Sequence, residues 1–261
     1  MKKASKPLLN TRLSAQSSKD LLEDRREKAT TRYPFHEISE HLDVKISPRA
    51  KRMALRVDAK DGSVKLVIPK RASIRSAYEF ALKNAYWIKD RVAEMPEAIA
   101  FDHGTVIPVL GKNRKISIDY NSTLKRTSII LKNNEIIVST NKEDPSSRIK
   151  RFLIDLAKKE LTALAHLKAE MADRTIDRVD VKDTTSRWGS CSHDGRISFS
   201  WRLIFAPMEA MDYVVAHEVA HLVHLDHSPN FWRVCEQLSN QYHKGHRWMK
   251  KNGAQLMRYG A

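Results

Sequence analysis

The chain has 261 residues, of which 41% are hydrophobic and 30% charged, a length and composition that suit one large or two modest soluble globular domains. It lacks the run of about 18 apolar residues that a membrane-spanning helix needs, and the segment from Met1 to Asp20 lacks the apolar core of a secretory signal peptide. Its two cysteines, Cys191 and Cys235, are too few for a disulfide framework, so we expect reduced thiols and a cytoplasmic protein without a membrane partner.

The formal net charge of +16 suggests a polyanionic partner, because a basic surface attracts phosphates without specificity. The lysines and arginines are nevertheless spread along the whole chain, with no arginine-rich block and no stacking motif of aromatic residues. We therefore expect a solvated basic surface, and we keep nucleotide or nucleic-acid contact as an alternative.

The first predicted element is a flexible basic arm over residues 1–35, which is polar and short of aromatic side chains. Three short strands follow, with Asp61-Gly62 as a hairpin turn. A long amphipathic helix then begins at the N-cap Ser73 and ends near Pro96. The three strands run from Leu42 to Ile46, Met53 to Val57 and Val64 to Ile68.

A second group of four short strands is predicted next, so residues 36–143 form a β-rich region with one long helix. Asp144-Pro145 supplies a cap and a first helical position for another long helix that runs towards Met171. The four strands run from Val106 to Leu110, Ile116 to Tyr120, Ser128 to Leu131 and Ile136 to Ser139.

Two more strands are predicted at Val179 to Val181 and at Arg196 to Phe205. The second leads into a helix that begins after Pro207, and it is either an edge on which an extended peptide could pair or an interior strand. The order of elements predicts an α+β fold, with small antiparallel β blocks in the N-terminal part and a helical catalytic region over residues 144–261.

The most informative motif is the run His217-Glu218-Val219-Ala220-His221. Residues four apart lie on one face of a helix, so His217 and His221 can both direct a ring nitrogen at one ion, with Glu218 beside them. Three nitrogen ligands leave a fourth position of a zinc ion open for water, as in catalytic sites. The alternative is a pair of core histidines that are satisfied by hydrogen bonds.

His227 is the predicted third ligand, provided that the chain turns after His221. Asp226 tolerates the left-handed conformation that ends many helices, and Ser228-Pro229 supplies a cap and first position for the next helix. His224 and Glu236 are the competing ligands. Cys191 as a fourth ligand would close the site and make it structural.

The motifs around the histidines resemble those of the YgjP-like predicted metal-dependent hydrolases, a zincin-type group related to SprT-like metalloproteases. The resemblance extends from about residue 40 to 250 and implies a zincin-like fold with His217, His221 and His227 as zinc ligands. The family often has asparagine where this chain has Asp226. The matching runs are Arg187-Trp188-Gly189-Ser190-Cys191-Ser192, Trp201-Arg202-Leu203, Asp212-Tyr213-Val214-Val215, His217-Glu218-Val219-Ala220-His221 and His227-Ser228-Pro229-Asn230-Phe231-Trp232.

We therefore expect a zinc hydrolase with one ion per chain, in which Glu218 takes a proton from the zinc-bound water and returns it to the leaving group. A metallopeptidase acting on peptide or protein is the leading interpretation. The alternatives are a zinc-dependent nucleotide phosphohydrolase and a DNA-associated SprT-like protease or nucleic-acid-binding module. Arg187 and Trp188 could line the cleft or lock a loop, and Tyr213 could donate to an oxyanion or support the site by packing.

Overall fold

The computed structural model describes residues 33–57, 63–93, 98–184 and 187–260. The chain divides into two compact units, residues 1–95 and 96–261, and each is considered by itself. Residues 1–32 of the predicted arm, the Asp61-Gly62 turn and the predicted helix end near Pro96 lie outside the described residues. No helix in the described ranges is both long enough and apolar enough to cross a membrane.

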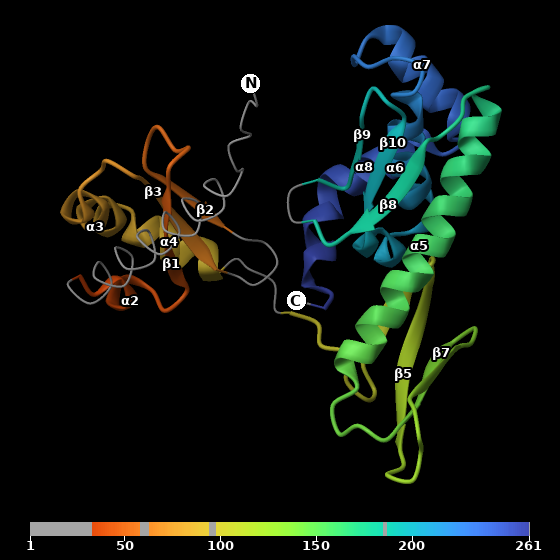
Figure 1. Cartoon of the computed structure of the whole chain (residues 1–261), viewed down its shortest axis with the longest axis horizontal. Helices are drawn as coiled ribbons and strands as arrows, with labels where there is room; N and C mark the ends of the chain where they lie inside the picture. The colour runs from red at the N-terminus through yellow and green to blue at the C-terminus, as the bar shows by residue number, and fades with distance from the viewer. Residues whose placement is uncertain (1–32, 58–62, 94–97, 185–186, 261) are drawn as a thin grey trace, which may run out of the picture. The chain divides into compact units, whose positions relative to one another are not determined.

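The N-terminal unit has a three-stranded sheet in the order β1-β3-β2 (Figure 1). β2 pairs with β3 in antiparallel fashion, but β1 runs parallel to β3, which corrects the expectation of an antiparallel block. The parallel pair arises because β2 and β3 pair as neighbours in the chain, while β1 joins the other side of β3. The elements are α2 (Phe35–Ile38), β1 (Leu42–Ser47), β2 (Ala54–Val57), β3 (Val64–Pro69), α3 (Ile74–Lys83) and α4 (Ala85–Ala93).

The long helix predicted after Ser73 is two helices, α3 and α4. Ser73 is the N-cap as predicted, and its Oγ accepts a hydrogen bond from the Ser76 amide at 3.0 Å. Asn84 separates the helices, because its side chain donates to the Phe80 carbonyl at 2.8 Å and competes with the continuing helical ladder.

The C-terminal unit begins with a four-stranded sheet in the order β4-β5-β7-β6. β5 and β7 are parallel and the other pairs are antiparallel, so this block is also mixed. The long helix begins at Ser146, whose amide donates to Asp144 Oδ1 at 2.9 Å. The elements are β4 (Val106–Val109), β5 (Lys112–Tyr120), β6 (Ser128–Leu131), β7 (Glu135–Thr140) and α5 (Ser146–Met171).

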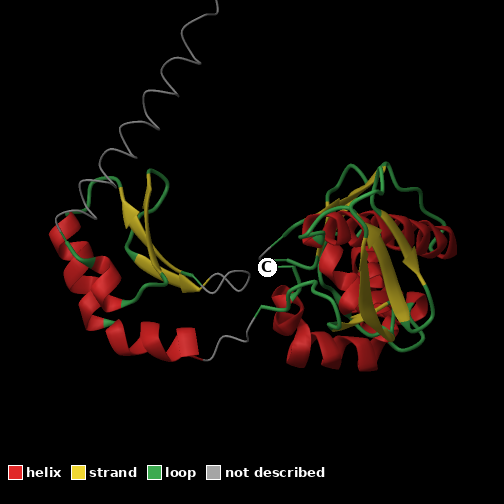
Figure 2. Ribbon diagram, turned by 90° about the horizontal axis from the view of Figure 1, so that it is seen from below, coloured by secondary structure: helices red, strands yellow, loops and turns green. Residues whose placement is uncertain are grey.

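One hydrophobic core joins this sheet to the helices that follow it. Ile116 and Val138 from the sheet, Leu153 from α5 and Val215 from a later helix are all fully buried in one cluster. The second β block therefore buries its apolar face on the helices that follow and belongs to the same compact unit, residues 96–261, within which the position predicted as a boundary at residues 143 and 144 falls. Figure 2 shows the strands of this unit lying against its helices.

A third sheet has the order β8-β10-β9, so the strand at Arg196, which the sequence left as an edge or an interior strand, is interior. β10 is parallel to β8 and antiparallel to β9, and β9 is left with one partner among the described strands. The strand predicted to reach Phe205 ends at Ser200, because all five residues of the following 3-10 helix are buried and leave no outward face. The elements are β8 (Arg178–Lys182), β9 (Gly189–Cys191), β10 (Arg196–Ser200) and η1 (Trp201–Phe205).

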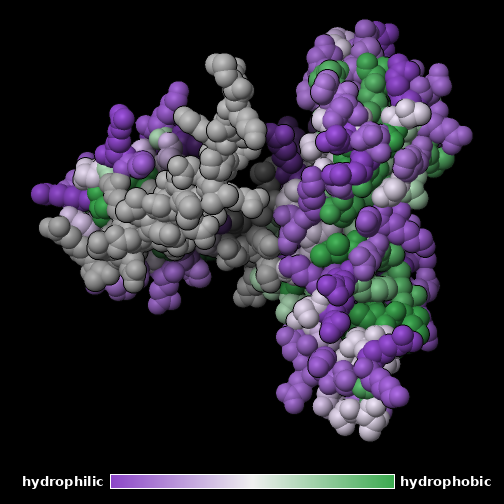
Figure 3. All heavy atoms as spheres, viewed as in Figure 1, coloured by the Kyte–Doolittle hydropathy of each residue, from purple (hydrophilic) through white to green (hydrophobic). Residues whose placement is uncertain are grey.

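Four helices complete the C-terminal unit and carry the motif residues. Hydrophilic side chains cover much of the visible face of this unit, with smaller hydrophobic areas between them (Figure 3). The mixed arrangement of helices and small sheets confirms the α+β class. The elements are α6 (Met208–Ala220), α7 (Pro229–Leu238), α8 (Tyr242–Asn252) and η2 (Gly253–Arg258).

Candidate metal centre

Helix α6 places the first two histidines on one face. His217 lies inside the helix, and His221 is its C-cap with helical backbone angles of φ −67° and ψ −17°. The spacing of one helical turn is therefore kept although α6 ends at Ala220, and the two ring centroids lie 5.1 Å apart.

The turn that follows is made in a different way from the one predicted. Among the described residues the non-glycine positions with positive φ are Leu110 and Asp173, so Asp226 does not adopt the left-handed conformation. The Asp226 carboxylate instead accepts a hydrogen bond from Ser228, which lowers its pKa. Ser228 is the N-cap of α7 as predicted, with its Oγ 3.4 Å from the Phe231 amide.

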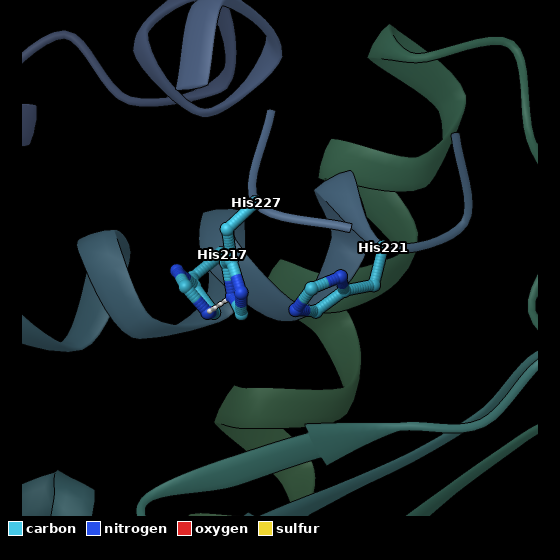
Figure 4. Close-up of side chains that lie close together, drawn as sticks. All are labelled: His217, His221 and His227. Atoms are coloured by element: carbon cyan, nitrogen blue, oxygen red, sulfur yellow. Dashed lines mark hydrogen bonds between the residues drawn. The ribbon is translucent and has the colours of Figure 1, made fainter. Parts of the chain in front are cut away.

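The turn brings His227 to the two histidines of α6 (Figure 4). Its Nε2 lies 3.3 Å from Nε2 of His217, and one candidate ligand atom from each of the three residues lies within 4.8 Å of the others. Nitrogens bound at 2.0–2.1 Å to one tetrahedral ion are separated by about 3.3–3.4 Å. The spacing of His217 and His227 therefore fits a shared zinc ion.

Hydrogen bonding and burial keep two of these rings in a form that can bind a metal. Nδ1 of His221 lies 3.1 Å from the His224 carbonyl, and only a protonated nitrogen can donate there, so the lone pair is on Nε2. Burial, with a smaller contribution from the neighbouring histidines, lowers the pKa of His217 to about 4. His217 is therefore neutral near pH 7, the form that binds a metal.

The competing ligands are not part of this group. His224 contributes its carbonyl, and Glu236 lies 3.8 Å from His243. Burial, assisted by the charge of Glu218, raises the pKa of Cys191 to about 11, so it stays a thiol. In the described ranges, the one group of this kind that could hold a metal consists of His217, His221 and His227.

Glu218 is buried beside the histidines, with 6% of its surface exposed. Burial raises its pKa to about 8, and the positive charge of Arg187 opposes that rise. Its carboxylate lies against the backbone of β9, because a Cβ added at Gly189 would come within 2.5 Å of Glu218 Oε1. Any side chain at position 189 would displace this carboxylate.

A pocket of about 340 Å³ opens next to His217 and Glu218. Arg187, Trp188 and Tyr213, which the sequence predicted to lie near the site, all line this pocket. The sequence did not predict the lining residues Gly189, Met249 and Lys250. Gly189 lines the pocket because the Glu218 side chain lies against its backbone. No local sequence pattern indicates that the two α8 residues reach the pocket. The lining residues are Arg187, Trp188, Gly189, Tyr213, Val214, His217, Glu218, His246, Met249 and Lys250.

Tyr213 belongs to α6 and lines the pocket. Its ring centroid lies 6.0 Å from that of His217 and 5.3 Å from that of His246. Burial raises its pKa above the usual range, so it remains a phenol. Helix α8 lies so close to α6 at Gly245 that an added Cβ would come within 2.1 Å of the Glu209 carbonyl oxygen.

A buried ionic cluster lies on another face of α6. Lys168 Nζ of α5 lies 2.5 Å from Asp212 Oδ1 and donates to the Leu238 carbonyl at 2.5 Å. Ser239 Oγ donates to Asp212 Oδ2, also at 2.5 Å. These contacts fix the end of α7 to α6, and the beginning of α7 follows His227. Lys168 therefore departs from the solvated basic surface expected from the sequence.

Comparison with known proteins gives a family for most of the chain. The family model described as YgjP-like, metallopeptidase domain, matches residues 51–252. No curated protein matches the chain significantly. The crystal structure of the metallopeptidase zymogen of Pyrococcus abyssi abylysin matches with 22% identity over 35% of this chain and 93% of that chain. Its TM-score of 0.31 is too low to carry an argument about the fold.

Proposed function

The chain belongs to the YgjP-like metallopeptidase family, and from that premise we propose that it is a zinc-dependent peptidase with His217, His221 and His227 as the ligands of one ion. The observation that carries this proposal is the convergence of three ring nitrogens from helix α6, its C-cap and the turn that follows. His227 is exposed and the other two rings are half-buried, so a fourth ligand position would face solvent and could take water.

The residues beside the ion divide the chemistry among them. A bound zinc ion would supply a Lewis acid and lower the pKa of a water molecule from about 15.7 towards about 7. Glu218 would accept the proton from that water and deliver it to the leaving amine. A carboxyl with a pKa raised by burial is suited to both steps, because it exchanges a proton close to neutral pH.

The edge strand β9 is the proposed place for the substrate main chain. It pairs only with β10 among the described strands, and its Gly189 contacts Glu218. An extended peptide that added to this edge would run beside the metal centre through main-chain hydrogen bonds. The peptide-pairing edge that the sequence offered as one alternative at Arg196 to Phe205 is therefore proposed for the neighbouring strand β9.

The alternatives from the sequence have less support. The family match favours a peptide or protein substrate, and no observation on the described residues favours nucleotide hydrolysis or nucleic-acid binding. Arg187, Trp188 and Tyr213 are proposed to bound the substrate pocket, with Tyr213 acting by packing against His217. A cytoplasmic location stays a prediction.

Metal analysis and activity together test the proposal. We expect one zinc ion per wild-type chain, a large loss of zinc in His227→Ala, and retention in the matched control His224→Ala. Glu218→Gln should keep its zinc and lose about 10²–10⁴-fold in peptidase kcat, the usual contribution of a general acid and base. Full zinc retention in His227→Ala, or full activity in zinc-loaded Glu218→Gln, would contradict the assignment.

A further inference from the structure

The pocket beside Glu218 combines apolar walls with positive charge. Trp188, Val214 and Met249 supply apolar surface, while Arg187 and Lys250 supply cationic groups. Glu218 is the single acidic residue among those lining it. Since that carboxylate is proposed to serve the reaction, the pocket offers a substrate two cations without a dedicated counter-charge.

These two cations differ from other basic side chains near the site. Lys244, also on α8, lies 2.9 Å from Glu209, and Lys168 is paired with Asp212. The side chains of Arg187 and Lys250, in contrast, form no ion pair or hydrogen bond with any residue the structure describes. They come from separate elements, the segment before β9 and helix α8, and both border one cavity.

We propose that this pocket receives a carboxylate of the substrate, either an acidic side chain or the C-terminal carboxylate of a peptide, an inference that rests on the proposed peptidase function. A volume of about 340 Å³ suits one side chain or a chain end. Gly189 belongs both to the edge strand and to the pocket lining. A peptide paired with β9 therefore passes the pocket mouth.

A phosphorylated small molecule would satisfy the same cations, but it lacks the main-chain donors and acceptors that pair with a strand edge. The pocket walls are mostly apolar, which suits the methylene stem of glutamate or the side chain of a terminal residue. The combination of a strand edge and two cations therefore favours a peptide carboxylate.

The test uses zinc-loaded, full-length protein and matched peptides. One set differs only by glutamate or glutamine at each position around the cleaved bond, and a second set carries a C-terminal acid or amide. We expect wild-type kcat/KM to favour the anionic member of one set by about tenfold, as for a hydrogen bond to a charged group. The set that shows the preference identifies the source of the carboxylate.

Substitutions in the pocket test whether the preference for anionic peptides arises there. Lys250→Gln and Arg187→Gln should each reduce the ratio of anionic to neutral kcat/KM, and Lys250→Glu should reverse it in favour of the neutral peptide. Lys251→Gln and Arg247→Gln are the matched controls, because these neighbours do not line the pocket, and they should keep the wild-type ratio. Calorimetry with zinc-loaded Glu218→Gln should show the same preference in binding affinity.

The outcomes separate this inference from the function on which it rests. Peptide cleavage with an unchanged ratio in both pocket variants would overturn the carboxylate pocket and leave the peptidase intact. Absence of peptide cleavage by the zinc-loaded wild type would contradict the peptidase itself. Hydrolysis of a nucleoside triphosphate that is lost in Arg187→Gln would assign the cations to phosphate and overturn the proposal.

Discussion

Two carboxylates of helix α6, Asp212 and Glu218, lie on different faces of the helix. Asp212 has ion-pair and hydrogen-bond partners for its charge, whereas Glu218 has none among the described residues. Asp212, with 27% of its side chain exposed, lies against Lys168 and Ser239. Glu218 is more deeply buried, yet it has no ion-pair or hydrogen-bond partner among the described residues. A neutralised buried charge holds helices together, whereas one without a partner is available for proton transfer.

The largest expected effect comes from breaking the paired side. Asp212→Ala would leave the Lys168 ammonium, 5% exposed, without its counter-charge. We expect the free energy of unfolding to fall by about 3 kcal/mol, as for other ion pairs that lose one partner. Urea denaturation followed by circular dichroism measures this loss. Replacing both partners, in Lys168→Met with Asp212→Leu, should recover much of it, and a double variant as unstable as the single one would show that the pairing is not the cause.

A smaller effect of the opposite sign is expected at Glu218. In metal-free protein the folded carboxyl has a pKa of about 8 against 4.5 for the free group. The folded state therefore binds more protons between these pH values, and wild-type stability should fall as the pH rises through that window. Glu218→Gln should remove this slope and stabilise the metal-free protein by about 2 kcal/mol at pH 8. Thermal unfolding in the presence of a chelator from pH 5 to 8 measures this pH dependence. If the stabilities of wild type and Glu218→Gln changed with pH in the same way, burial would not raise the pKa of Glu218.

The smallest expected effect is at Ser239, the neutral member of the paired side. Ser239→Ala removes the hydroxyl that donates to Asp212 but leaves the Lys168 contact in place. We expect a loss of about 1 kcal/mol in unfolding free energy, the usual value for one hydrogen bond. The same urea measurement applies, and a loss as large as that of Asp212→Ala would mean that the hydroxyl, rather than the lysine, holds the cluster together.

The convergence of the three histidines was largely predictable because it rests on local geometry. The spacing of His217 and His221 specifies one helix face, and Ser228-Pro229 specifies where the next helix begins. These two signals place His227 near the pair without tertiary information. The detail of the turn was wrong, since Asp226 acts through its side chain on Ser228 and not through a left-handed backbone.

Features that depend on distant partners were not predictable in the same way. Alternating burial identifies Ile197 and Phe199 as inward-facing, but it does not say which strands flank β10 or in which direction they run. The mixed sheets and the edge position of β9 therefore appear only in the structure. Lys168 looks like one more solvated lysine in the sequence, because nothing near it in the chain indicates Asp212.

The close approach of two helices at Gly245 has a consequence for engineering. The width of the pocket depends on the distance between α8 and α6. The two backbones approach closely because Gly245 has no side chain. His246, Met249 and Lys250 project from this fixed support. A designer could exchange these three side chains to change the chemistry of the opening and keep its dimensions, whereas one added methyl group at position 245 would change the dimensions and leave the chemistry as it is.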